Sequence, residues 1–200
     1  MPREIHMYRY PARTLFHGSE LVEITISALV LSLAFSIAWR RLDIFPWALL
    51  TVGVGFIGHE LAHKFTAQRF GFWASYRIMP MWLLLALLVS VLGMVFAALG
   101  AVQIFGRSVT GRVMSREEEG VISMAGPTFN IVLSAVFMVS WVLTGSRYGV
   151  LSIGAYLNAL LAVFNLIPFW ILDGQKIFAW DKKVWLLGFV VSAVLLILST

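Results

Sequence analysis

The amino-acid sequence predicts an all-α polytopic membrane protein with five or six transmembrane helices and a small β-segment at the membrane interface. Of its 200 residues, 60% are hydrophobic and only 12% are charged, whereas about a quarter of the residues of a soluble domain are charged. The hydrophobic residues form six segments, at approximately 21–39, 44–65, 81–105, 121–144, 149–172 and 184–200. Most of these approach the roughly 20 residues that a helix needs to cross the hydrocarbon core of a bilayer. No soluble domain fits between them, so residues 1–200 are expected to form a single transmembrane domain.

The charge pattern fits a membrane surface better than a nucleic-acid partner. The net charge of +5 comes from Lys and Arg grouped between the hydrophobic segments, where such residues contact lipid headgroups. The sequence contains no Cys, which excludes a disulfide framework, a thiolate metal site and a cysteine nucleophile. Any bound metal must therefore use His and carboxylate ligands.

The second hydrophobic segment contains an H-E-x-x-H motif, His59-Glu60-Leu61-Ala62-His63. Residues four apart lie on one face of a helix, so the two imidazoles can hold one metal ion. Glu60 lies beside them and can take a proton from a water molecule at that metal. Ionisable side chains at membrane depth are costly unless they bind something. The motif therefore predicts a zinc hydrolase.

A third metal ligand is needed, and Asp173 is the favoured candidate. It ends an apolar run that is interrupted by Pro168 and is followed by Gly174. Proline breaks the helical hydrogen-bond ladder and glycine permits an unusual backbone, so this helix can unwind and bring the carboxylate to a buried site. Two His and one carboxylate leave a position for water, as a catalytic zinc site requires. The alternatives are that Asp173 only ends a helix, or that the ligand is Glu23, which we interpret as an interfacial carboxylate.

Two further patterns lie inside hydrophobic segments. Asn130 follows Gly126-Pro127 in the fourth segment, and Gly-Pro is expected to loosen the helix there. An amide inside an apolar helix must find a partner. It can join two helices, donate to a substrate carbonyl, or contact Glu60 or a metal ligand, and the sequence does not separate these roles. Residues 53–58 spell G-x-G-x-x-G without a β-α-β context, so we reject nucleotide binding and expect the small residues to let a neighbour approach.

Two connecting segments have predictable structure. Residues 70–78 are aromatic and rich in strand-forming residues, so either an interfacial strand or hairpin or an ordinary aromatic loop is expected. Ser115 and Glu118 match a capping box, which predicts the start of a helix and no catalytic role.

Three motifs, H-E-x-x-H, G-P-x-x-N and N-x-x-P-x-x-x-L-D-G, follow one another within this hydrophobic chain. Together they resemble the site-2 protease family of intramembrane zinc metalloproteases, over residues 44–180. The resemblance implies one Zn2+ per chain held by His59, His63 and Asp173, with Glu60 as the catalytic acid/base. It also implies core helices at approximately 44–65, 121–144 and 149–172. Asn165, which begins the third motif, is expected with Asn130 to contact a ligand or the substrate.

The sequence departs from the family pattern in two places. Residues 169–171 replace a proline-rich stretch, and Gln175 stands where a second glycine is common. These changes concern how Asp173 is delivered and leave every ligand in place. The PDZ or CBS domains of many relatives have no counterpart, so a minimal member is expected. The sequence does not indicate the oligomeric state.

The basic residues predict the membrane topology. If all six segments crossed, Asp173 would end on the side opposite His63. If segment 81–105 is instead re-entrant, helped by Gly93 and Gly100, the two residues share a side and the charges divide twelve to three. The twelve are Arg3, Arg9, Arg13, Lys64, Arg69, Arg77, Arg107, Arg112, Arg116, Lys176, Lys182 and Lys183, against Arg40, Arg41 and Arg147. This strong positive-inside signal favours five spans in the cell membrane and a cytoplasmic N-terminus.

The predicted function is intramembrane proteolysis, with a transmembrane protein as substrate and the lipid bilayer as its surroundings. A helical substrate must unwind to expose a peptide bond, and residues 70–78 are expected to accept it by β-addition. The main alternative is a zinc-binding transporter or channel with His and Asp residues along an ion path. Transport requires neither a Glu directly after the first His nor one concentrated site. An inactive relative that assists assembly is a further alternative, which the intact H-E-x-x-H argues against.

Overall fold

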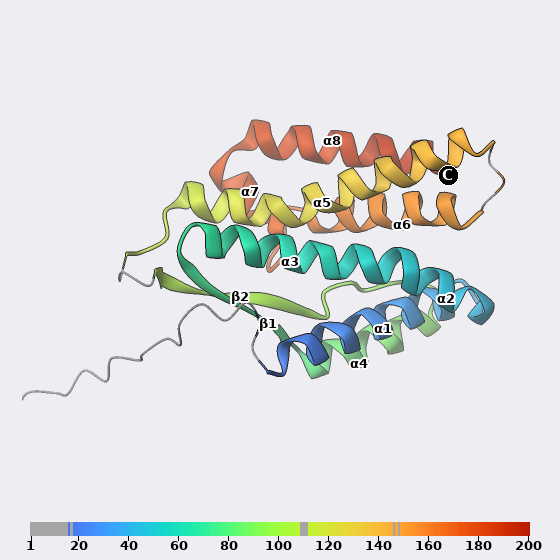
Figure 1. The fold of residues 1–200 in the computed structure, drawn as a ribbon, viewed down its shortest axis with the longest axis horizontal. Coiled ribbons are helices and arrows are strands. Elements are labelled where there is room, and N and C mark those ends of the chain that lie inside the picture. The colour runs from blue at the N-terminus through green and yellow to red at the C-terminus, as the bar shows by residue number, and fades with distance from the viewer. Residues whose placement is uncertain (1–15, 17, 109–111, 146, 148) are drawn as a thin grey trace, which may run out of the picture.

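The computed structural model describes residues 16–200 apart from 17, 109–111, 146 and 148. Arg3, Arg9 and Arg13, on which the predicted orientation partly depends, lie outside the described residues. The helices are α1 (Glu20–Ala38), α2 (Phe45–Ala48), α3 (Val54–Arg69), α4 (Pro80–Val91), α5 (Arg116–Leu143), α6 (Gly149–Asn165), α7 (Asp173–Trp180) and α8 (Lys182–Leu198), and the strands are β1 (Phe72–Ile78) and β2 (Gly100–Ser108) (Figure 1). A 3-10 turn at Leu42–Ile44 leads into α2, and a π-helical turn at Leu49–Gly53 joins α2 to α3, so that Leu42–Arg69 is one helical stretch.

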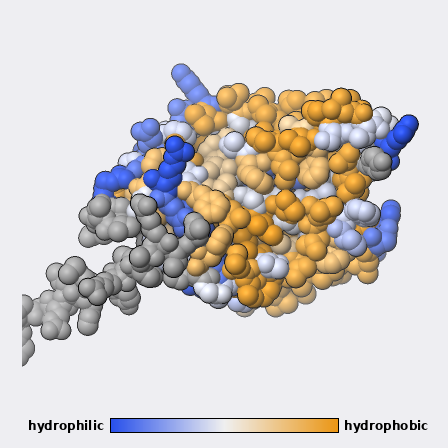
Figure 2. Space-filling view, viewed as in Figure 1, coloured by the Kyte–Doolittle hydropathy of each residue, from blue (hydrophilic) through white to orange (hydrophobic). Residues whose placement is uncertain are grey.

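The surface is that of a membrane protein. Within the described residues, three helical stretches are long and apolar enough to cross a bilayer, namely Glu20–Ala38, Leu42–Arg69 and Arg116–Leu143. The face seen in Figure 2 is hydrophobic over most of its area, and hydrophilic residues gather toward the ends of the long axis. Exposed side chains such as Leu29, Leu88, Val136 and Leu187 contribute to the apolar surface. A large contiguous apolar surface is rare on soluble monomers, which confirms the membrane class, whereas the number of five or six spans stays a prediction.

α3 lies between two groups of elements (Figure 1). On one side it packs on α5, which in turn contacts α6 and α7, while α8 packs on α6. On the other side α3 contacts β1, and α1 packs on both β1 and α4. The main hydrophobic core joins α1, α3 and α6 and includes Leu31, Phe35, Phe56 and Leu157.

The glycines of residues 53–58 let neighbouring helices approach α3, as predicted. A Cβ at Gly55 would overlap the side chain of Asn158 on α6, and a Cβ at Gly58 would overlap the ring of Phe129 on α5. The G-x-G-x-x-G spacing therefore serves helix packing.

Residues 70–78 contain a strand, the first of the two predicted alternatives. β1 pairs with β2 in an antiparallel ladder that places Tyr76 opposite Val102. Residues 100–105 were predicted to end the third hydrophobic segment, and that boundary was wrong. α4 stops at Val91, Gly93 adopts a φ of 82° and the chain returns to form β2. The third segment therefore turns back on itself and does not form one long helix.

The free edge of β1 is occupied, which overturns the expectation that residues 70–78 accept a substrate strand. On that edge, the Tyr76 N–H donates to Glu20 Oε1 at 2.8 Å, and the Ile78 N–H donates to Glu23 Oε2 at 3.0 Å. Both carboxylates belong to α1. Glu23 is therefore hydrogen-bonded to the edge of the sheet. Among the described residues, the cluster of possible metal ligands contains His59, His63 and Asp173 and does not include Glu23.

The predicted capping box at the start of α5 is confirmed. Ser115 Oγ accepts from the Glu118 N–H at 3.2 Å, and the Glu118 carboxylate accepts from the Ser115 N–H at 2.9 Å. Glu118 also accepts from Arg112 at 2.6 Å. This cap fixes where α5 begins.

Candidate metal centre

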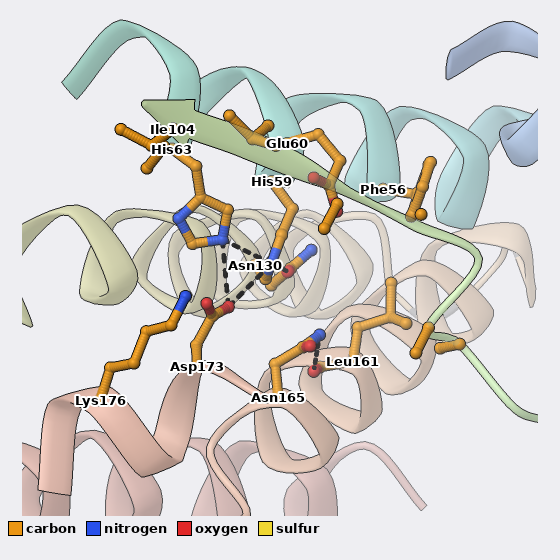
Figure 3. A pocket seen from close by; sticks show the side chains of 15 residues that line it. Phe56, His59, Glu60, His63, Ile104, Asn130, Leu161, Asn165, Asp173 and Lys176 are labelled. Carbon is orange, nitrogen blue, oxygen red and sulfur yellow. Dashed lines mark hydrogen bonds and ion pairs between the residues drawn. The ribbon is translucent and has the colours of Figure 1, made fainter. Parts of the chain in front are cut away.

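The three predicted metal ligands meet in one place (Figure 3). His59 and His63 are buried on α3, and their Nε2 atoms lie 3.0 Å apart. Asp173 Oδ2 lies 3.3 Å from His59 Nε2 and 3.0 Å from His63 Nε2. Ligands about 2.0–2.1 Å from a tetrahedral zinc ion lie about 3.3 Å from one another. The three atoms are thus spaced as ligands of a single ion.

The break after α6 brings Asp173 to this place. α6 ends at Asn165, Trp170 adopts a left-handed φ of 49°, and α7 starts at Asp173. Gly174 is needed because a Cβ there would overlap the Leu166 carbonyl. The predicted unwinding around Pro168 is confirmed. Trp170, one of the residues that depart from the family pattern, packs its ring against Trp82 of α4 with centroids 5.4 Å apart.

The electrostatics of the site keep Asp173 ionised. Burial by itself raises the pKa of the Asp173 carboxyl, but the facing His63 and His59 side chains lower this pKa by more, to well below its ordinary value. An ionised carboxylate is the form that binds a cation.

Both histidines present Nε2 to the site because Nδ1 is engaged elsewhere. His63 Nδ1 lies 2.7 Å from the Ile122 carbonyl, and His59 Nδ1 lies 2.6 Å from Asn130 Oδ1. Both partners are acceptors, so each Nδ1 carries a hydrogen, and Nε2 is the nitrogen that each imidazole can offer to a metal.

Asn130, on α5, is fully buried. Besides accepting from His59, it donates through Nδ2 to the Gly55 carbonyl at 3.1 Å and to Asn158 Oδ1 at 3.0 Å. Of the roles that the sequence left open, the geometry supports contact with a metal ligand and the joining of helices. Asn158 was missed by the sequence analysis. The signal in the sequence was a second amide side chain inside an apolar segment. Asn158 belongs to none of the three motifs.

Gly126 explains why the second motif contains a glycine. A Cβ at this position of α5 would lie 2.6 Å from His59 Nε2 and would also overlap His63 Nε2. Gly126-Pro127 was expected to loosen the helix. The structure shows instead that Gly126 leaves the space in front of both metal-facing nitrogens open, inside a continuous α5.

A cavity of about 80 Å³ opens beside these ligands. Its wall also includes Glu60, Asn165, Lys176 and the β2 residues Val102 and Ile104. This volume holds a few water molecules but no helix, whose diameter with side chains is about 10 Å. A peptide that reaches the site must therefore be extended.

Glu60 lies beside β2 at the wall of the cavity (Figure 3). Its carboxylate lies within hydrogen-bond reach of the Val102 N–H. In an antiparallel ladder, opposite residues either bond to each other or both point away. Tyr76 directs its N–H away from β2 to Glu20, so Val102, opposite it, directs its N–H away from β1. The free edge of β2 therefore faces the cavity.

Two residues complete the cavity wall. Asn165 lines it as expected, but its Nδ2 donates to the Leu161 carbonyl of its own helix at 3.0 Å, and the described residues show no contact with a metal ligand. Lys176, which the sequence analysis missed, points into the cavity toward Asp173 (Figure 3), and its charge acts on Glu60 and His63. The available signal was its position one helical turn after Asp173.

These features define a membrane protein with a hydrolytic type of metal centre: two imidazoles, one carboxylate, a nearby Glu and room for water. Over 174 residues, 85% of this chain and 88% of the relative, the chain is 34% identical to a protein of Methanocaldococcus jannaschii whose name is "putative zinc metalloprotease". The chain belongs to this family of zinc metalloproteases. No protein-family model matches it, and no solved structure does.

Proposed function

We propose that this protein is an intramembrane zinc endopeptidase of the site-2 protease type, which cleaves other membrane proteins within or near their transmembrane helices. The observation that carries the proposal is the meeting of His59, His63 and Asp173 beside Glu60, on a helical stretch apolar enough to cross a membrane. A transporter can also place His and Asp inside a membrane. It has no need of a carboxylate next to the ligands, and the family relationship adds weight to proteolysis.

His59, His63 and Asp173 would hold one zinc ion, which when bound acidifies water and polarises a peptide carbonyl. Glu60 takes a proton from the attacking water and passes it to the departing amine. Glu60 is only 7% exposed, so little bulk water competes for this proton. Lys176, at the cavity wall, can stabilise negative charge that develops on the substrate.

The substrate segment binds as a third strand on β2. A helix that unwinds loses its backbone hydrogen bonds, and pairing with a free strand edge replaces them. Val102 and Ile104 lie two apart on β2, so both direct their N–H groups to the free edge. Both also line the metal cavity. β1 is excluded from this role because Glu20 and Glu23 of α1 hold its edge. On β2 the Glu60 carboxylate lies at the Val102 N–H, so it has to release that N–H before a substrate strand can pair there.

Ile104→Pro tests the strand. Proline removes the outward N–H, so cleavage should fall while zinc content stays unchanged. Ile104→Ala is the matched control, because it shortens the side chain and keeps the N–H. Full activity of Ile104→Pro, or an equal loss in Ile104→Ala, would exclude strand pairing at this residue.

The proposed topology has five spans, a re-entrant segment 81–105 and a cytoplasmic N-terminus in the cell membrane. The distance of 3.0 Å between Asp173 and His63 supports it, because six crossings would separate these residues across the membrane. In Figure 1, α1 begins at the end of the molecule where α3 ends and α7 lies, and the C-terminus lies at the opposite end. A tag at the C-terminus should be labelled only from outside the cell, and cytoplasmic labelling would refute the five spans.

The deciding experiment is incubation of the purified protein with a model transmembrane substrate, with and without a zinc chelator, followed by mass analysis of the products. Cleavage that the chelator abolishes and added zinc restores supports the proposal. Zinc flux into proteoliposomes without any cleavage would instead identify the transporter.

A further inference from the structure

We infer that Asn158 is a positioning residue for the reaction: acting through Asn130, it fixes the ring orientation and tautomer of His59. Asn158 touches neither the metal ligands nor the cavity. The inference rests on the proposed role of His59 as a metal ligand, but its test does not depend on activity.

The amide of Asn158 can adopt only one orientation. The residue is fully buried, and its Nδ2 faces the Gly154 carbonyl at 2.9 Å and the Thr51 carbonyl at 3.4 Å. Backbone carbonyls only accept hydrogen bonds, so the nitrogen must face them. The oxygen of Asn158 is therefore directed at Asn130.

The amide of Asn130 is fixed by the same reasoning. Its Nδ2 donates to the Gly55 carbonyl and to Asn158 Oδ1, at 3.1 and 3.0 Å. Each of its two N–H groups thus has one acceptor, and a flip would leave buried donors and acceptors unpaired, at a cost of about 1–3 kcal/mol per group. Asn130 Oδ1 is therefore held toward His59.

The consequence reaches the metal-facing nitrogen. With Asn130 Oδ1 at 2.6 Å, His59 keeps its hydrogen on Nδ1 and leaves Nε2 free to bind a cation. If Asn130 loses Asn158, one of its N–H groups has no acceptor, and the bond to the Gly55 carbonyl alone opposes rotation of the amide, so a flip costs less. A rotated amide would present N–H to His59 Nδ1 and favour the tautomer with hydrogen on Nε2, which cannot bind through that atom.

Interhelical packing alone does not account for this arrangement. Ser134 Oγ also joins α5 to α6, by donating to the Ala155 carbonyl at 2.8 Å, and it is equally buried. That bond makes no contact with Asn130. Ser134 therefore offers a matched control for simple helix joining.

Gly55 makes room for the two amides. A Cβ at Gly55 would overlap Asn158 Oδ1, so α3 carries no side chain where Asn158 and Asn130 meet.

The test uses the metal-free protein with 15N-labelled histidine, in a background where His6 and His17 are replaced by Gln, so that only the two site histidines are observed. In the unchanged site, both should show hydrogen on Nδ1. In Asn158→Leu, His59 should gain a population without hydrogen on Nδ1, the nitrogen that faces Asn130, whereas His63, held by the Ile122 carbonyl, should not change. Zinc affinity should fall about tenfold, and the absorption spectrum of bound Co2+ should shift.

Two control variants make the result specific. Ser134→Ala should leave both histidines and zinc affinity unchanged. Asn158→Asp should retain the His59 tautomer, because an Asp buried here among neutral groups is protonated and then carries an acceptor and a donor like those of Asn. The inference is overturned if His59 keeps its tautomer in Asn158→Leu, if His63 changes equally, or if Ser134→Ala has the same effect. Failure of the proposed function would appear differently, as absence of cleavage by the unchanged protein.

Discussion

Buried polar side chains on the two faces of α3 have different kinds of hydrogen-bond partner. His63 and Lys64 are neighbours in sequence, yet His63 faces α5 and the metal cavity, whereas Lys64 forms an ion pair with Glu20 of α1. On the first face, neutral amides and backbone carbonyls are linked through Asn130 and Asn158. On the second face the groups are charged, and the side chains of Lys64 and Glu20 are each only 2% exposed.

The difference teaches what each kind of contact can specify. An amide has a distinct donor end and acceptor end, so each amide in a hydrogen-bonded series fixes the orientation of the next. Such a series can therefore select a histidine tautomer. A buried ion pair fixes only the relative positions of the elements that carry it. Glu20 pairs with Lys64 and also accepts from the Tyr76 N–H, so Glu20 holds α1, α3 and β1 together. Changes on the first face should therefore alter metal binding, and changes on the second face should alter stability.

Asp173→Ala should have the largest effect, because it removes both a ligand and the charge that compensates a buried cation. Zinc affinity should fall by more than 100-fold and activity should be lost, while the helices remain, since most of their packing does not involve the metal. Zinc content per chain and circular dichroism measure the two properties. Glu23→Ala is the control, because Glu23 lies on α1 and binds the edge of β1. This variant should keep about one zinc per chain. Retained zinc in Asp173→Ala together with zinc loss in Glu23→Ala would show that the third ligand is misassigned.

Gly126→Ala should weaken metal binding without weakening the fold. The added Cβ enters the space in front of His59 Nε2, 2.6 Å away, although Ala is better than Gly in a helix by up to about 1 kcal/mol. Lower zinc affinity with unchanged or raised thermal stability is the expected pair of results. Gly149→Ala, where a Cβ would meet no atom within 4 Å, should leave zinc affinity unchanged. Full zinc affinity in Gly126→Ala would mean that the metal does not sit between these histidines.

Glu60→Gln should separate binding from chemistry. Gln cannot take a proton, so turnover should fall by about 10²–10⁴-fold, while His59, His63 and Asp173 still bind zinc. Mass analysis of the products tests the loss of turnover, and zinc content measured on the same sample tests the retention of the metal. Loss of zinc, or substantial residual cleavage, would contradict the role of Glu60.

Glu20→Gln should have the smallest effect on the site, although it weakens the fold. It leaves Lys64 buried without its charged partner, which should cost about 3–5 kcal/mol of unfolding free energy. Gln retains an acceptor for the Tyr76 N–H, and zinc affinity should stay within a fewfold of normal. Adding Lys64→Met should restore much of the stability. If Glu20→Gln weakens zinc binding as strongly as Gly126→Ala, the two faces of α3 are not separate.

The sequence by itself determined the features that depend on near neighbours in the chain. Hydrophobic segments of membrane length, two histidines four residues apart, the capping box at Ser115 and the break between Pro168 and Gly174 all follow from short-range geometry. Asp173 could be proposed as a ligand because the carboxylates offered few alternatives in a chain without Cys.

Only the tertiary structure decided which distant groups meet. The pairing of β2 with β1, the binding of Glu20 and Glu23 to the edge of β1, and the link from Thr51 through Asn158 and Asn130 to His59 each join residues that are far apart in sequence. A periodic pattern shows which face of a helix is apolar, but it carries no information on which amide or strand edge will lie opposite. That choice is made when the helices pack, because every buried donor and acceptor must then find a partner.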